Sequence, residues 1–290
     1  MVTEHFADGS PKPLTANDIR LFTSALIVMA SVGEKITYEC MDKEPPRESE
    51  VSQMFYTFDS ESPSGHIMDA FLLIQHANLT GFDHVRSLVA LMRTTPPRST
   101  ALATVTRGAL EAFSRTWFLL RASGPGELSH RQLSLLYSDL RHPASLRIPI
   151  ATLDGDPIDP VERRASFAAE LTRLGLPAPL KIELSRLVAD LLDSEFKDAS
   201  GARRYSDLSA IAHGQRLGTN TFVVRDDIGG IGGFAAPREV VVEFAVQAFA
   251  SMSATMGAFI RVFGNDARHV ARLETATHRA AVALSEFDKA

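Results

Sequence analysis

Apolar residues recur every three or four positions along most of the chain, which is the spacing of one face of an α-helix. The pattern is clear near the N-terminal end, where Thr15 or Asn17 can cap a helix that reaches about Cys40. Further helices are expected at 66–93, 99–121, 128–140, 160–174, 180–196, 202–213, 237–263 and 265–287. The sequence therefore predicts an all-α fold, a helical bundle of about eight to ten helices.

Proline and glycine interrupt this pattern at two places. The segment 142–160 holds four prolines and is expected to be an irregular loop. We expect a single domain over 1–290, and this loop is the alternative place to divide it. The second interruption, near 219–235, has a strand signal at 221–225 that pairs with 229–234, so a small β-hairpin is expected.

The second interruption also matches a dinucleotide-binding pattern, GxGxxA, over Gly230–Ala235. A dinucleotide fold needs a second parallel strand after the following helix. Here that helix is followed by another helix, so a hairpin or a mobile lid is the preferred interpretation, and no cofactor is expected.

Composition limits the class of protein. The chain has 290 residues, 45% of them hydrophobic and 22% charged, with a net charge of -5. This excludes wholesale disorder and argues against a broad basic surface for polyanions, although a local basic groove stays open. Cys40 is the single cysteine, and Leu21–Val32 is too short to cross a bilayer. A cytoplasmic protein without a membrane segment is expected.

The helix at 99–121 carries charges on one side of an otherwise apolar segment. Arg107, Glu111 and Arg115 stand four residues apart and therefore share a face. One interpretation is an exposed salt-bridge ladder. The other is that the three side chains line an internal cavity or hold a loop by bidentate contacts, because charges on so apolar a helix are costly to bury.

The helix at 202–213 places Tyr205, Ser209 and His213 on one face, with Arg204 beside them. Tyrosine, serine and histidine together could transfer protons or position an anion. The alternative needs no function, because a histidine in the last turn before Gly214 is favoured by the partial negative charge of the free carbonyls.

A metal site is not expected. His76 and His84 lie on one predicted helix. Eight residues of helix separate them by about 12 Å, too far for one ion. The sequence also has no HExxH motif, no phosphate-binding GxxxxGK[ST] loop and no GxSxG elbow.

The run from Arg107 to Glu111 and the later Tyr205-Ser-Asp-Leu-Ser-Ala-Ile-Ala-His213 resemble an uncharacterised group of helical bacterial proteins. That group is similar in turn to the HEPN superfamily, which includes metal-independent ribonucleases of toxin and phage-defence systems. Nucleases of that superfamily space their arginine and histidine more closely than Arg204 and His213, which eight residues separate.

The resemblance implies a helical core, a polar site shared by two helices and a homodimer. For a ribonuclease of this kind, Arg204 or Arg107 would stabilise the charge of the phosphorane. His213 would move a proton to or from the ribose hydroxyl.

Three functions remain open at this point. The first is an RNA-acting, HEPN-like protein. The second is a pocket for a small apolar molecule, favoured by the Met and Phe residues of 252–263 and a lid at 229–233. The third is a non-enzymatic dimer that buries its terminal helices. The candidate catalytic residues are Arg107, Glu111, Arg204, Tyr205 and His213, and the candidate substrate contacts are Arg115, Ser209 and Trp117. An exposed His213 far from Arg107 and Glu111 would contradict a shared site.

Overall fold

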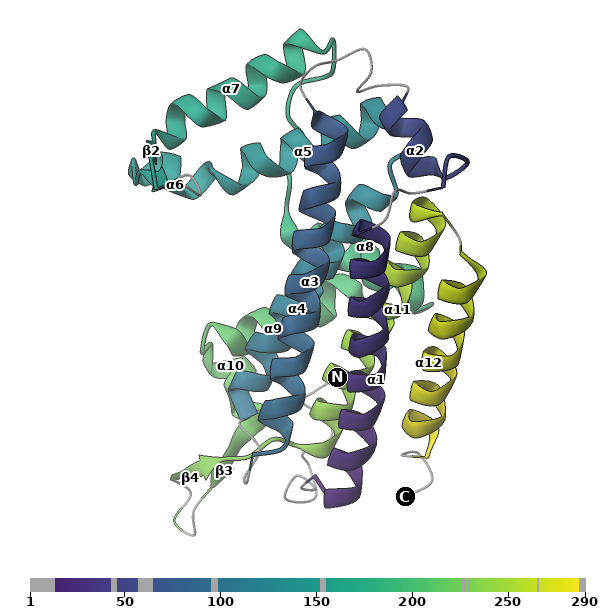
Figure 1. The fold of residues 1–290 in the computed structure, drawn as a ribbon. Helices are drawn as coiled ribbons and strands as arrows, with labels where there is room; N and C mark the ends of the chain where they lie inside the picture. Colours follow the sequence, from purple (N-terminus) through teal and green to yellow (C-terminus); the bar gives the residue numbers. More distant parts are fainter. Residues whose placement is uncertain are drawn as a thin grey trace.

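The computed structural model describes residues 14–42, 46–56, 65–94, 99–151, 155–225, 228, 230–264 and 266–286. These residues form mainly helices, together with two small two-stranded sheets, which confirms the predicted all-α class (Figure 1). Five long helices make the body of the bundle: α1 (Ala16–Met41), α3 (His66–Met92), α4 (Ser99–Leu120), α11 (Arg238–Phe263) and α12 (Ala267–Ser285).

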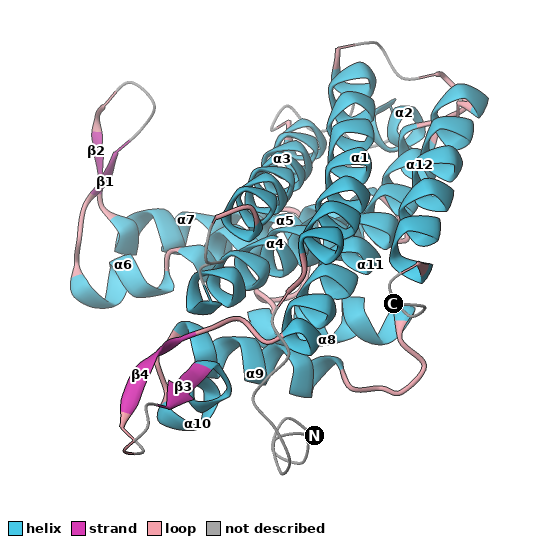
Figure 2. Cartoon of the chain, turned by 90° about the horizontal axis from the view of Figure 1, so that it is seen from below, coloured by secondary structure: helices cyan, strands magenta, loops and turns pink. Residues whose placement is uncertain are grey.

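Shorter helices surround this body. α8 (Leu184–Glu195) and α9 (Gly201–Ala212) pack on α4, and α10 (Arg216–Thr219) follows α9. α5 (Pro125–Asp139), α6 (Arg141–Leu146) and α7 (Pro160–Arg173) extend away from the bundle (Figures 1 and 2). α2 (Glu50–Met54), α6 and α10 lie in segments where no helix was expected.

The first helix begins where the sequence predicted. The Thr15 hydroxyl accepts a hydrogen bond from the Asp18 backbone nitrogen at 3.1 Å, and the Asp18 carboxylate accepts from the Thr15 nitrogen at 2.9 Å. This reciprocal capping box satisfies two donors that a helix N-terminus otherwise leaves unpaired.

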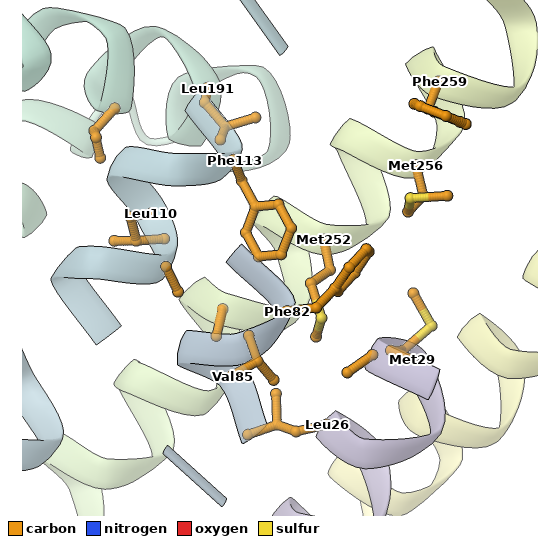
Figure 3. Close-up of a cluster of buried hydrophobic side chains, with 14 of the residues drawn as sticks. Leu26, Met29, Phe82, Val85, Leu110, Phe113, Leu191, Met252, Met256 and Phe259 are labelled. Atoms are coloured by element: carbon orange, nitrogen blue, oxygen red, sulfur yellow. The ribbon is translucent and has the colours of Figure 1, made fainter. Parts of the chain in front are cut away.

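The core lies between α1, α3, α4 and α11. Phe82 of α3 and Phe113 of α4 meet edge to face, with ring centroids 5.3 Å apart, and both are fully buried (Figure 3). Two glycines allow this close packing. A Cβ atom at Gly33 would lie 2.5 Å from the Phe82 ring, and one at Gly81 would lie 2.6 Å from Phe113.

Met252, Met256 and Phe259 of α11 are also fully buried, and in Figure 3 they lie among the side chains of the core. The earlier alternative assigned the Met and Phe residues of this segment to a ligand pocket. These three fill the interior of the bundle instead.

The expectation of an irregular loop at 142–160 was wrong in part, because only 147–149, 155–156 and 159 among its described residues lack regular structure. The segment contains most of α6 and an antiparallel pair, β1 (Ile150–Ala151) with β2 (Pro157–Ile158). Pro143 is compatible with α6 because it stands in the first turn, where its missing amide donor leaves no helical bond unmade. Pro157 lies in a two-residue edge strand, which also tolerates proline.

After this segment the chain returns to the helices before it. The Arg164 guanidinium lies 4.0 Å from the Tyr137 ring centroid of α5, and its Nε donates to the Tyr137 carbonyl at 3.2 Å. His66 at the start of α3 contacts Glu170 of α7 at 2.5 Å. Direct contacts therefore bridge the segment 142–160, which was the alternative place to divide the chain.

The second hairpin is confirmed. β3 (Val223–Arg225) pairs antiparallel with β4 (Ile231–Phe234), so the GxGxxA residues lie in and beside a hairpin strand (Figure 2). Gly229 lies outside the described residues, and the lid stays a prediction.

One of the described helices, α11, is long and apolar enough to cross a membrane, with a mean hydropathy of 1.3. Half of that stretch is buried within the structure, where α11 packs on α4 and α1. The core helix of a soluble bundle has the same length and composition.

Candidate functional site

Four of the five candidate catalytic residues meet where α4 and α9 pack together. The Glu111 Oε1 atom accepts hydrogen bonds from Arg107 Nε and from the Tyr205 hydroxyl, both at 2.7 Å. The Arg107 Nη1 atom lies 2.8 Å from Nε2 of His213. Residues about a hundred positions apart in the chain therefore form one connected cluster.

Helical spacing places the side chains of each helix on the face that meets the other helix. Arg107 and Glu111 stand one turn apart on α4, and Tyr205 and His213 stand two turns apart on α9. His213 is the C-terminal cap of α9, and the chain then turns at Gly214, whose φ of +66° is in the left-handed region. His213 is exposed as a result, whereas Tyr205 is buried.

Tyr205 and Arg107 of this cluster both have raised pKa values. Burial, and after it the hydrogen bond to Glu111, raises the pKa of Tyr205 to about 12. Partial burial opposes the charge on Arg107, but the contact with Glu111 outweighs it and raises the pKa of Arg107. Tyr205 is therefore a hydrogen-bond donor near neutral pH and not a base.

The contact between Arg107 and His213 determines the state of the imidazole. A guanidinium can only donate, so Nε2 of His213 must accept with a free lone pair in this arrangement. The same guanidinium lies 5.4 Å from the Tyr205 ring centroid, which adds a cation–π contact. The site thus presents a proton acceptor next to a permanent cation on an exposed surface.

Two other candidate arginines make their contacts elsewhere. Arg115 binds both carboxylate oxygens of Asp139 on α5, at 2.8 and 2.7 Å, so the predicted ladder ends at Glu111. Arg204 donates to Ser200 at 2.7 Å and to Glu243 at 2.9 Å. Neighbouring residues on a helix point about 100° apart, which separates the side chains of Arg204 and Tyr205. Catalytic or binding roles for the two arginines stay predictions.

The remaining candidates, Ser209 and Trp117, lie on the same two helices. Ser209 is half-buried on α9, one turn before His213. Trp117 is half-buried on α4, where the Arg121 guanidinium lies 4.5 Å from its ring centroid. Its position on α4 places Trp117 on a different face from Glu111, so its role in binding a substrate also stays a prediction.

The structure adds His84 to this region. Its ring packs on Gly108, next to Arg107, so closely that a Cβ atom at Gly108 would lie 2.8 Å from His84 Nε2. From the sequence, His84 was weighed only as a metal ligand. Helical spacing does not reveal which neighbouring helix a side chain packs against. Within the described ranges, no group of three or more His, Cys, Asp or Glu residues could hold a metal ion.

Compared with known protein families, curated proteins and solved structures, the chain matches none of them.

Proposed function

We propose that the protein binds RNA on the exposed face formed by α4 and α9 and cleaves it with Arg107 and His213. The observation that carries this proposal is the 2.8 Å contact between the Arg107 guanidinium and His213 Nε2. The resemblance to HEPN ribonucleases led us to expect an arginine and a histidine close together. In this chain the pair comes from two helices, not from one short motif.

RNA can be cleaved by its own 2′-hydroxyl when a base takes the hydroxyl proton and a cation stabilises the phosphorane. A phosphate oxygen that accepts from Arg107 would release the lone pair of His213 Nε2. The Nε2 atom would then take the proton of the 2′-hydroxyl while the 2′-oxygen forms a bond to phosphorus and the bond between phosphorus and the 5′-oxygen breaks. The proton passes to the leaving oxygen, and the products are a 2′,3′-cyclic phosphate and a 5′-hydroxyl.

Glu111 and Tyr205 are positioning residues in this mechanism. Glu111 accepts from both Arg107 and Tyr205, so it fixes the plane of the guanidinium. The protonated Tyr205 keeps the Glu111 carboxylate in place. Both contacts are made before any substrate arrives, which lowers the cost of organising the site.

The exposure of His213 favours a large substrate bound at the surface over an enclosed small molecule. The net charge of -5 predicts that few phosphates are contacted and that affinity depends only weakly on salt. The proposed function is therefore weak binding of RNA together with its cleavage at Arg107 and His213.

His213→Gln is expected to slow cleavage of single-stranded RNA by about 10²–10⁴-fold, the usual contribution of one general base. His278→Gln is the matched control, because His278 is exposed on α12 and belongs to no contact of the site. Cleavage is measured by gel, and the cyclic phosphate is identified by mass spectrometry. Activity is expected to persist with a chelator and to be lost at a nucleotide that lacks its 2′-hydroxyl.

The proposal is wrong if the purified wild-type protein leaves RNA intact across a panel of sequences, or if His213→Gln cleaves as fast as the wild type. Arg107→Lys is the second variant, because lysine keeps the charge but loses the fork that serves Glu111 and His213 together. It is expected to fold normally and to cleave more slowly.

A cytoplasmic homodimer belongs to the same proposal. Large apolar side chains next to α9 are exposed on α10 and the β3–β4 hairpin, namely Leu217, Ile228, Ile231 and Phe234. Exposed apolar side chains gathered in this way are typical of an interface. Ile231→Asp is therefore expected to convert dimers to monomers in light scattering, whereas Val161→Asp on α7 is not. A monomeric wild-type protein at micromolar concentration would contradict the dimer.

A further inference from the structure

A second cluster, unrelated to the α4–α9 face, joins the end of α1 to the start of α12. The Cys40 Sγ atom lies 3.6 Å from Nδ1 of His269, and Nε2 of the same ring lies 3.1 Å from the Glu39 carboxylate. Arg272 donates to the same Glu39 oxygen at 2.7 Å. His269 is buried, whereas Cys40 is partly exposed. A thiol, an imidazole and a carboxylate thus stand in series.

The order of the hydrogen bonds assigns the protons. The hydrogen bond with His269 has the largest effect on the pKa of Glu39, and together with the contacts of Arg272 it lowers that pKa against the opposing effect of burial. The Glu39 carboxylate is therefore ionised and only accepts, so Nε2 of His269 carries the ring proton. In the neutral imidazole Nδ1 then has the free lone pair, to which the Cys40 thiol can donate. This is the arrangement of a nucleophile, a base and a group that orients the base.

Cys40 also lines a mainly apolar pocket of about 330 Å³. Besides Cys40, its apolar lining includes Val51, Phe55, Met68, Phe71 and Phe263. Phe71 and Phe263 meet edge to face with ring centroids 5.4 Å apart, which makes one wall rigid. The volume is at the lower end of the range for ligand sites and suits a modest apolar group.

We propose that Cys40 is an acyl-acceptor nucleophile that reacts with an apolar acyl thioester bound in this pocket. The Cys40 sulfur attacks the carbonyl carbon and forms a new carbon–sulfur bond, while the thiol proton passes to Nδ1 of His269. The bond between the carbonyl carbon and the donor sulfur then breaks. The departing sulfur takes the proton from His269, which returns the imidazole to its starting state, and Cys40 keeps the acyl group.

The pocket and the triad supply different parts of this reaction. The aromatic and aliphatic walls hold the acyl chain by removing apolar surface from water. His269 increases the nucleophilicity of the sulfur only as the reaction proceeds, since its lone pair already faces the thiol. Glu39 keeps the ring in the required tautomer, and Arg272 keeps Glu39 in place.

The experiment uses the fact that Cys40 is the single cysteine of the chain, so every thiol adduct reports on this site. The full-length protein is incubated with acetyl-, butanoyl-, octanoyl- and hexadecanoyl-coenzyme A, and the intact mass is followed with time. One acyl group per chain is expected, faster with an intermediate chain than with acetyl, and removed by neutral hydroxylamine. Cys40→Ala is expected to form no adduct.

His269→Gln is expected to slow acylation by about 10²–10⁴-fold, and His278→Gln on the same helix is the matched control. Met68→Lys is expected to slow acylation by octanoyl- and hexadecanoyl-coenzyme A more than acylation by acetyl-coenzyme A, because Met68 lies on the pocket wall. Thermal unfolding of each variant shows whether it is folded.

Equal rates in His269→Gln and the wild type would overturn the role of the triad. Failure of every thioester to react, while iodoacetamide alkylates Cys40 in the same sample, would overturn the proposal as a whole. If His269→Gln does not fold, Glu39→Gln replaces it, with a smaller slowing expected because the base remains but loses its orienting group.

Discussion

Replacing Phe82 by alanine is expected to lower the free energy of unfolding by about 3–5 kcal/mol, the largest change expected from one core substitution. Phe82 is fully buried, meets the Phe113 ring at 5.3 Å, and closes the space above Gly33. Its removal leaves a cavity that the close-packed helices cannot fill by moving together, so packing is lost in addition to the transfer of apolar surface from water.

Urea unfolding followed by circular dichroism measures this change. The matched control is Leu72→Ala, because Leu72 is half exposed on the same helix, α3, and packs far less. We expect that control to change the free energy of unfolding by less than about 1 kcal/mol. A Phe82→Ala protein as stable as the Leu72→Ala protein would show that α1, α3, α4 and α11 do not pack around Phe82 as described.

Arg238→Met is expected to cost about 3–5 kcal/mol, because it leaves a buried carboxylate without its cation. Asp18 is only 1% exposed, and Arg238 binds its two oxygens at 3.1 and 3.2 Å across the junction of α1 and α11. Replacing both residues, as in Asp18→Asn with Arg238→Gln, is expected to recover part of the loss. The double variant keeps a hydrogen-bonding side chain at position 18 for the capping box and buries no charge.

The same pair predicts a pH dependence. Burial opposes the ionised form of Asp18, but the hydrogen bonds from Arg238 and Thr15 outweigh it and lower the pKa of Asp18 below its ordinary value of 3.8. A lowered pKa in the folded state contributes stability above the unfolded pKa, and that contribution is lost as the pH falls through the folded pKa. The wild type should therefore lose more stability than Arg238→Met between about pH 6 and about pH 3. Parallel losses would contradict the assigned pairing.

Sequence periodicity was most successful for the long helices. The capping box at Thr15 and the C-terminal turn at Gly214 are made by residues within a few positions of each other, so they are readable from local sequence. The loop at 142–160 was misjudged because the positions of its prolines, in a first helical turn and in a two-residue edge strand, tolerate the missing donor.

The candidate site was predicted in part. The spacing of Arg107 with Glu111, and of Tyr205 with His213, correctly placed each pair on one face of its own helix. The spacing also suggested Arg204 and Arg115, whose contacts lead to Ser200, Glu243 and Asp139. A helical pattern predicts the direction in which a side chain points, but it does not predict which residue the side chain contacts.

By itself, the sequence determined the all-α class, the bounds of most helices and the small hairpin, because each depends on interactions within a few residues. Only the tertiary structure decided that Arg107 meets His213 and that Cys40 meets His269, a residue 229 positions away. The physical reason is that an apolar stripe requires its face of the helix to be buried against another helix. Many apolar helix faces can bury it about equally well. The choice among them is made by side-chain shapes across the whole core, such as the Phe82 ring that Gly33 admits.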